Sequence, residues 1–121
     1  MTNPFASHVA MHLESYGPGW SRYTLTVIPD IHMNPNGVVH GAVLYGLADT
    51  GMGSALFPLL EENQWCATLE IKMNYFRPAM EGELICDTEL VNKSRTLANL
   101  ESRVRLNDKL IAQANGNYVI R

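Results

Sequence analysis

The chain has 121 residues, a length typical of one domain with a buried core, and we treat residues 1–121 as a single domain. Its net charge is −3 and its Lys and Arg residues form no basic run, which argues against nucleic acid or an anionic membrane surface as the partner. The two cysteines lack metal-ligand spacing and no secretory signal pattern opens the chain, so we expect a cytoplasmic protein with reduced thiols.

The N-terminal part of the chain predicts a short helix followed by a strand. Residues 3–14 begin with Asn-Pro, which suits a helix start, and they place Phe5 and Val9 on one helical face. The Tyr-Gly-Pro-Gly sequence at residues 16–19 should end this helix. Residues 20–28 then alternate between apolar and polar, as expected of a half-buried strand.

A turn and a long apolar helix occupy the middle of the chain. Residues 34–37 read Asn-Pro-Asn-Gly, which favours a turn, and residues 41–57 are long enough for about five helical turns. The ionisable residues of this stretch are His40 at its start and Asp49 in its middle. A membrane span is possible by length, but the central Asp and several glycines argue against it. We therefore interpret the stretch as a buried core helix.

The remaining sequence predicts a run of antiparallel strands. Residues 66–76 and 96–106 alternate clearly, and the segments 83–92 and 109–120 are also β-like. Asn107-Asp108 fits a two-residue hairpin turn. One buried helix accompanied by alternating strands implies an α+β fold in which the sheet curves around the helix.

The central helix carries groups suited to acyl-transfer chemistry. Gly41 opens it, where free N–H groups and the positive end of the helix dipole favour a developing oxyanion. Asp49 could be a nucleophile or general base, or a structural carboxylate that caps or pairs with a neighbour. Asn34 offers a donor and an acceptor just before the turn.

The spacing of these groups predicts a site shared between two copies of the chain. Eight residues of helix separate Gly41 from Asp49, which is about 12 Å along the axis. Both groups would have to lie about 3 Å from the atoms of one reacting carbonyl. Either the two residues are unrelated, or a second helix brings its own Asp49 to this Gly41. We favour a two-fold dimer, which would form two equal sites.

Residues 32–41, followed by Leu-Ala-Asp at 47–49, resemble the signature of hotdog-fold acyl-CoA thioesterases. The nearest types are the phenylacetate-degradation and the Arthrobacter-type 4-hydroxybenzoyl-CoA thioesterases. The pattern is an Asn, a Gly three residues later, His-Gly six and seven residues later, and then Leu-Ala-Asp/Glu. Ala42 departs from it, since the family usually has a second Gly there. The resemblance implies a curved antiparallel sheet wrapped around a long central helix, with a short N-terminal helix.

The resemblance also implies roles for individual residues of the central segment. Gly41 would supply the oxyanion N–H, and Asn34 would lie near the thioester and the attacking water. Asp49 would come from the partner subunit as nucleophile or general base. His40 matches the family His, which either takes part in the chemistry or anchors the turn through hydrogen bonds.

Further residues match family positions outside the central helix. Thr68 falls where relatives place a Ser or Thr that holds water, although strand alternation assigns it to the polar side of its strand. Arg77 and the turn formed by Lys93, Ser94 and Arg95 resemble segments that contact the nucleotide phosphates of CoA. Cations at strand ends suit phosphates, although exposed cations are often merely solvated.

From these observations we expect hydrolysis of an acyl-CoA with a small aromatic or medium-chain acyl group. Coenzyme A would be part of the substrate, and we expect neither a separate cofactor nor a metal; His8 and His12 have helical spacing but lack a third ligand. The resemblance implies a homodimer and a homotetramer built from it. A non-catalytic acyl-CoA-binding or regulatory protein of the same fold is the alternative. A hotdog dehydratase would need a differently spaced His and carboxylate pair, which the sequence lacks.

Overall fold

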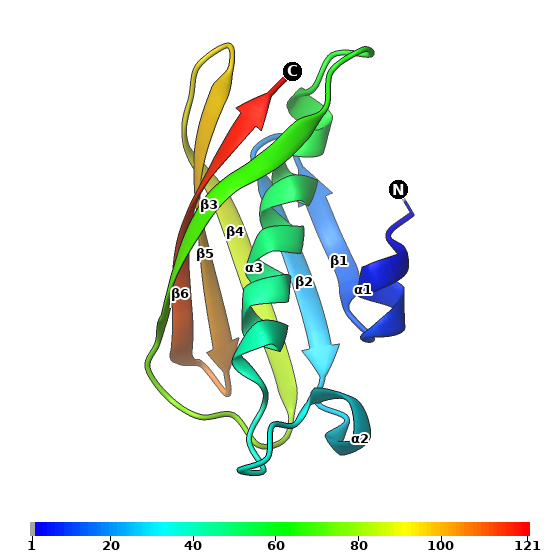
Figure 1. Cartoon of the computed structure of the whole chain (residues 1–121), viewed down its shortest axis with the longest axis vertical. Helices are drawn as coiled ribbons and strands as arrows, with labels where there is room; N and C mark the ends of the chain where they lie inside the picture. Colours follow the sequence, from blue (N-terminus) through cyan, green and yellow to red (C-terminus); the bar gives the residue numbers. More distant parts are fainter. Residues whose placement is uncertain (1) are drawn as a thin grey trace.

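The computed structural model describes residues 2–121, and it confirms the α+β hotdog architecture: a six-stranded antiparallel sheet curves around a long central helix (Figure 1). The elements in chain order are α1 (Pro4–His8), β1 (His12–Gly17), β2 (Trp20–Thr26), α2 (Pro29–His32), α3 (Gly41–Leu56), the 3₁₀ helix η1 (Phe57–Leu59), β3 (Cys66–Tyr75), β4 (Glu83–Lys93), β5 (Leu97–Leu106) and β6 (Lys109–Ile120). The strand order is β1-β2-β4-β5-β6-β3, so β1 and β3 form the edges. No helix within residues 2–121 has both the length and the apolar character needed to cross a bilayer.

The predicted N-terminal helix is confirmed only over Pro4–His8. The Asn3 side chain caps it by accepting from the Ala6 N–H at 3.0 Å, but the helix ends at His8. Ala10 has a φ of 61°, a left-handed conformation that a helix cannot continue through. The following residues form β1, which pairs with β2 and satisfies its backbone groups there. The prediction of helix over residues 9–14 was therefore wrong, and His8 and His12 lie on different elements.

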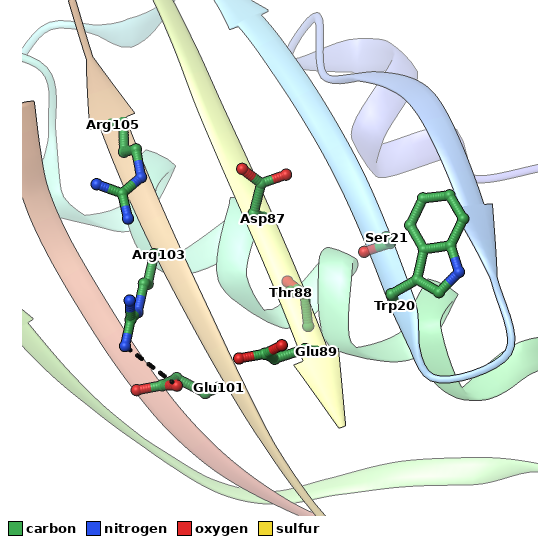
Figure 2. A pocket seen from close by; sticks show the side chains of 8 residues that line it. All are labelled: Trp20, Ser21, Asp87, Thr88, Glu89, Glu101, Arg103 and Arg105. Carbon is green, nitrogen blue, oxygen red and sulfur yellow. Dashed lines mark ion pairs between the residues drawn. The ribbon is translucent and has the colours of Figure 1, made fainter. Parts of the chain in front are cut away.

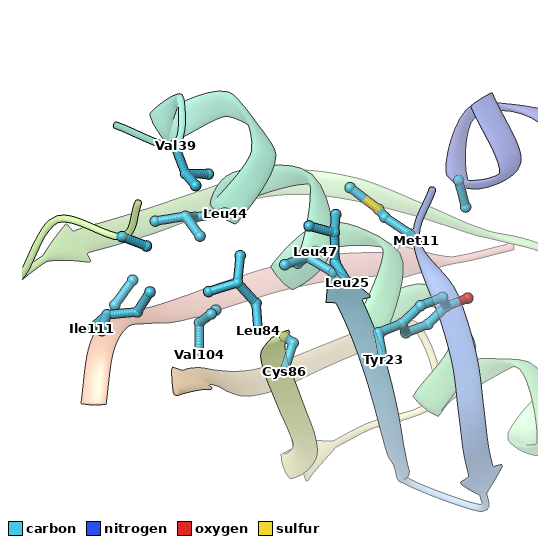
Figure 3. Close-up of a cluster of buried hydrophobic side chains, with 13 residues drawn as sticks. Met11, Tyr23, Leu25, Val39, Leu44, Leu47, Leu84, Cys86, Val104 and Ile111 are labelled. Atoms are coloured by element: carbon cyan, nitrogen blue, oxygen red, sulfur yellow. The ribbon is translucent and has the colours of Figure 1, made fainter. Parts of the chain in front are cut away.

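The central helix α3 packs one side against the concave face of the sheet. Its buried residues are Leu44, Gly46, Leu47, Ala48, Gly51, Met52, Ser54, Ala55 and Leu56. Figure 3 shows Leu44 and Leu47 above inward side chains of the sheet, such as Leu84. This packing accounts for the apolar residues on that side of the helix.

A stripe of positions along α3 stays partly accessible to solvent. Ala42, Tyr45, Asp49 and Gly53 recur at intervals of three or four residues, and we call them the uncovered stripe. Tyr45 is 38% exposed, and a Cβ added at Gly53 would meet nothing within 4 Å. The stripe is thus one open face of the helix, with Asp49 in its middle.

A β-bulge in β3 changes which side chains face the helix. Thr68 pairs with Tyr118, but the next paired residue of β3 is Glu70, so Leu69 is an extra residue. Such an insertion reverses the alternation on one side of the bulge. Thr68 therefore points to α3, and Leu69 is 57% exposed. The alternation argument that assigned Thr68 to the polar side was wrong for this reason.

The predicted strands after the helix are otherwise confirmed. The segments expected at 66–76, 83–92, 96–106 and 109–120 match β3 to β6 within one or two residues. Asn107 and Asp108 have φ values of 51° and 64°, which is the backbone of the expected two-residue hairpin.

Candidate active site

Two hydroxyl groups hold the Asp49 carboxylate on the uncovered stripe. The Thr68 hydroxyl donates to Asp49 Oδ1 at 2.7 Å. The Tyr118 hydroxyl donates to the same oxygen and also to the Asp49 backbone carbonyl at 2.8 Å. Asp49 itself is half-buried, and it lines a pocket of about 430 Å³ together with Thr68 and Tyr118. The acid is thus both held by donors and accessible from a pocket.

The two other ionisable side chains at this pocket are neutral at ordinary pH. Tyr118 is only 3% exposed, and burial, followed by the nearby Asp49 carboxylate, raises the pKa of its hydroxyl well above the usual range. Burial also raises the pKa of the Cys66 thiol, which lies at the start of β3. Cys66 is therefore a poor nucleophile.

The first turn of α3 has the properties of an oxyanion site. His40 Nδ1 accepts from the Ala42 N–H at 2.9 Å, and the Val43 N–H donates to the His40 carbonyl at 2.9 Å. Within residues 2–121, the backbone bonds account for these two N–H groups but not for that of Gly41. His40 is exposed and caps the helix, which is the anchoring contact considered for it. A free N–H at the positive end of the dipole is what a developing oxyanion requires.

Tyr75 covers the start of the helix, a contact that sequence reasoning did not foresee. Its hydroxyl donates to the Gly41 carbonyl at 3.0 Å. A Cβ at position 41 would lie 3.3 Å from the Tyr75 ring and hydroxyl, so glycine allows this close approach. Tyr118 is buried on its strand, where a Tyr needs a partner for its hydroxyl, whereas Tyr75 is exposed. That need is a weak signal, because it does not identify the partner.

Asn34 shapes the turn before α3 with its side-chain oxygen. Oδ1 accepts from the Asn36 N–H at 2.9 Å and from the Val38 N–H at 3.3 Å. Gly37 has a φ of 77°, which the turn requires. The oxygen of Asn34 is therefore already used by its own loop, and the amide NH₂ is the part that remains for a ligand.

The predicted phosphate-binding cations lie at opposite ends of the sheet. Arg77 follows β3 and lines a pocket of about 300 Å³ with Lys109, near the β5–β6 turn. Lys93, Ser94 and Arg95 form the β4–β5 turn, which lies at the other end of these strands. A strand of about ten residues separates the two groups by roughly 30 Å. One chain therefore cannot bring both to the same phosphate.

A second pocket, on the face of the sheet away from α3, is lined mostly by charged side chains. Figure 2 shows Asp87, Glu89, Glu101, Arg103 and Arg105 around this space of about 290 Å³. Two of its charged side chains form an ion pair, since an Arg103 nitrogen lies 3.6 Å from a Glu101 oxygen. The sequence-predicted site residues are not among those that line it. The candidate active site is therefore the helix side of the sheet.

The chain matches one protein family and is similar to known proteins. Residues 36–112 match the model of the thioesterase superfamily. A candidate esterase of Haemophilus influenzae is 32% identical over 97 residues, which are 79% of this chain and 69% of that protein.

Solved structures agree with this match. A thioesterase from Haemophilus influenzae aligns with a TM-score of 0.91 and 26% identity, covering 99% of this chain and 84% of that chain. A mutant phenylacetic acid degradation protein from Thermus thermophilus aligns with a TM-score of 0.89 and 28% identity, covering 97% of this chain and 98% of that chain.

Proposed function

The chain belongs to the thioesterase superfamily, and we propose that it hydrolyses the thioester of an acyl-CoA whose acyl group is small and aromatic or of medium length. The observation that carries this proposal is the Asp49 carboxylate, which is held by two hydroxyl donors yet lines an open pocket. The names of two similar proteins support the proposal: the first, a thioesterase, supports the reaction, and the second, a phenylacetic acid degradation protein, supports an aromatic acyl group.

In the proposed mechanism, the Gly41 N–H donates to the thioester carbonyl oxygen. The positive end of the α3 dipole stabilises the negative charge that develops there. In one route Asp49 attacks the carbonyl carbon, the CoA thiolate leaves, and water then hydrolyses the mixed anhydride that has formed. In the other route Asp49 takes a proton from water that attacks the carbonyl carbon, and the CoA thiolate leaves. Thr68 donates to Asp49, so its own oxygen remains able to accept a hydrogen bond from that water.

The distance along α3 requires two copies of the chain for this mechanism. Gly41 and Asp49 are about 12 Å apart on one helix, and the regular helix keeps the two residues at that separation. A second α3, antiparallel and packed on the uncovered stripe, would bring its Asp49 to this Gly41. The edge strand β3 lies beside the helix and exposes Leu69 and Tyr75, and Phe76 directly after it is also exposed, which favours contact with a second copy. We further expect two such dimers to form a homotetramer.

The same dimer suggests roles for the two groups of cations that lie far apart in one chain. Because Arg77 and the Lys93–Arg95 turn lie at opposite ends of the sheet, we propose that they act on CoA phosphates from different subunits or on different parts of the nucleotide. Arginine suits phosphate through paired N–H donors.

A thiol-release assay over a panel of acyl-CoAs tests the proposed function. Aromatic and medium-chain substrates should release CoA, and Asp49→Asn should lower kcat by about 10²- to 10⁴-fold while the thermal unfolding temperature stays close to that of the wild type. Binding of acyl-CoA without thiol release would instead support the non-catalytic alternative. Near-normal turnover of Asp49→Asn would remove Asp49 from the chemistry.

Mixing two inactive variants tests the shared site. Asp49→Asn retains Gly41, and Gly41→Pro retains Asp49 but lacks the N–H donor. If each site combines Gly41 of one subunit with Asp49 of its partner, half of the randomly mixed dimers regain one of two sites, which gives about a quarter of wild-type activity. A site built within one chain would give no recovery after unfolding and refolding the mixture.

A further inference from the structure

We propose that Tyr118 is a positioning residue for Asp49. Together with Thr68, the Tyr118 hydroxyl occupies one oxygen of the Asp49 carboxylate and leaves the other oxygen free to react. This inference rests on the proposed function, because it concerns how the acid of that reaction is held. It assigns to β6, the last strand, a part in a site otherwise formed by α3 and β3.

The hydrogen bonds make the two oxygens of the Asp49 carboxylate unequal. Thr68 and Tyr118 both donate to Oδ1. Across residues 2–121, the side-chain hydrogen bonds include none to Oδ2 of Asp49. Two donors on one oxygen fix the rotation of the carboxylate plane, which is otherwise a soft torsion. The free oxygen is then presented in one direction, as a nucleophile or a general base requires.

Tyr118 is better placed than Thr68 to fix this geometry. Its strand is hydrogen-bonded on both sides, since Tyr118 pairs with Thr68 of β3 and with Ala98 of β5. Its ring is 3% exposed, and its hydroxyl also donates to the Asp49 backbone carbonyl at 2.8 Å. The ring therefore ties the side chain of Asp49 to its own helix backbone. Thr68, in contrast, lies directly beside the bulge at Leu69.

The hydroxyl of Tyr118 stays a donor over the working pH range. Burial is the main cause that raises the pKa of this hydroxyl, and the Asp49 carboxylate adds to it. The groups that face the pair are Thr68 and Cys66, of which the first does not ionise and the second is held neutral by burial. A permanent donor stabilises the charged form of the carboxylate that it contacts.

The chain offers a matched pair of substitutions to test the proposal. Tyr118→Phe removes only the hydroxyl. Tyr23→Phe is the control, because Tyr23 is also 3% exposed and its hydroxyl makes a buried 2.8 Å hydrogen bond, but to Ser54 rather than to Asp49. Each variant loses the hydroxyl of one buried tyrosine together with its hydrogen bonds, so a purely structural effect should appear in both.

We expect Tyr118→Phe to lower kcat by about 10- to 100-fold with little change in KM, as for loss of a hydrogen bond to a charged group. The acidic limb of its kcat/KM profile should also move to higher pH, because the carboxylate has lost a donor to its charged form. Tyr23→Phe should keep the wild-type pH profile. If the two variants have the same kcat and pH profile, the proposal is wrong.

A second variant keeps the test valid if Tyr118→Phe does not fold. Incorporation of 3-fluorotyrosine at position 118 retains the ring and makes the hydroxyl a stronger donor, so the acidic limb should move to lower pH; an unchanged limb would contradict the proposal. A ¹³C NMR titration of the Asp49 carboxyl needs no substrate. If wild-type protein releases no thiol, the proposed function fails by itself, and equal titration midpoints in wild type and Tyr118→Phe would separately show that Tyr118 does not hold the acid.

Discussion

The Thr68 hydroxyl donates a 2.7 Å hydrogen bond to the Asp49 carboxylate, although regular alternation along β3 would turn Thr68 away from the helix. The bulge at Leu69 resolves this conflict, because one extra residue reverses the direction of the side chains before it. Bulges are often found next to active sites, where they redirect a side chain. Here the redirected side chain reaches the acid of the candidate site.

Thr68→Val should lower kcat by about 10- to 100-fold, because valine has the shape of threonine but cannot donate to Asp49. Thr26→Val is the control, since Thr26 lies exposed at the end of β2. Steady-state thiol-release kinetics check this prediction. Equal kcat values for the two variants would mean that the Thr68 contact is structural only.

Gly41→Pro should remove the oxyanion donor without unfolding the helix. Proline is well tolerated at the first helical position, and the preceding His40 has φ and ψ of −59° and 135°, which a residue before proline readily adopts. Gly41→Ala adds the same Cβ contact with Tyr75 but keeps the N–H. We expect kcat of Gly41→Pro to be about 10²- to 10³-fold below that of Gly41→Ala, measured by thiol release. Similar rates in both would show that the Gly41 N–H is not the donor.

Arg77→Ala and Arg95→Ala should each raise KM for acyl-CoA by about 3- to 10-fold, because each removes a charge-assisted contact with a phosphate. The same variants should be unaffected with an N-acetylcysteamine thioester, which lacks the nucleotide. Arg103→Ala is the control, since Arg103 lies near Glu101 on the far face of the sheet. A rise in KM for both kinds of substrate would argue against phosphate recognition.

The stability of the protein should fall at alkaline pH, in part through Cys86. This thiol is fully buried, and burial raises its pKa from 9.0 to about 12. Between these values the unfolded chain releases a proton that the folded protein retains, so the free energy of unfolding falls as pH rises from about 9 to about 12. One such group contributes about 1.4 kcal/mol per pH unit.

Urea unfolding of wild type and Cys86→Ala between pH 8 and pH 11 isolates this contribution. The cavity left by Cys86→Ala lowers stability equally at every pH, whereas the loss of the thiol makes the fall at alkaline pH shallower. Parallel curves for the two proteins would contradict the assignment. The same burial makes Cys86 unreactive with thiol reagents in the folded protein, which suits a thiol-release assay.

Local pattern was sufficient to predict most of the fold. The Asn-Pro-Asn-Gly turn, the apolar run of α3 and the alternation of β3 and β5 are all set by short-range steric and hydrophobic preferences. The N-terminal segment was an exception. Its residues 9–14 continue the helical spacing that begins at Phe5, but pairing with β2 makes residues 12–17 a strand.

The amino-acid sequence by itself identified the candidate residues of the proposed chemistry, since the turn places Gly41 at the start of the helix and Asp49 is the acid within it. Only the tertiary structure decided how that acid is held. The Thr68 contact depends on a bulge, and Tyr118 reaches Asp49 across 69 positions of sequence because β6 pairs with β3 beside the helix. Strand pairing and bulges are set by long-range packing, which a periodic pattern along one chain does not contain.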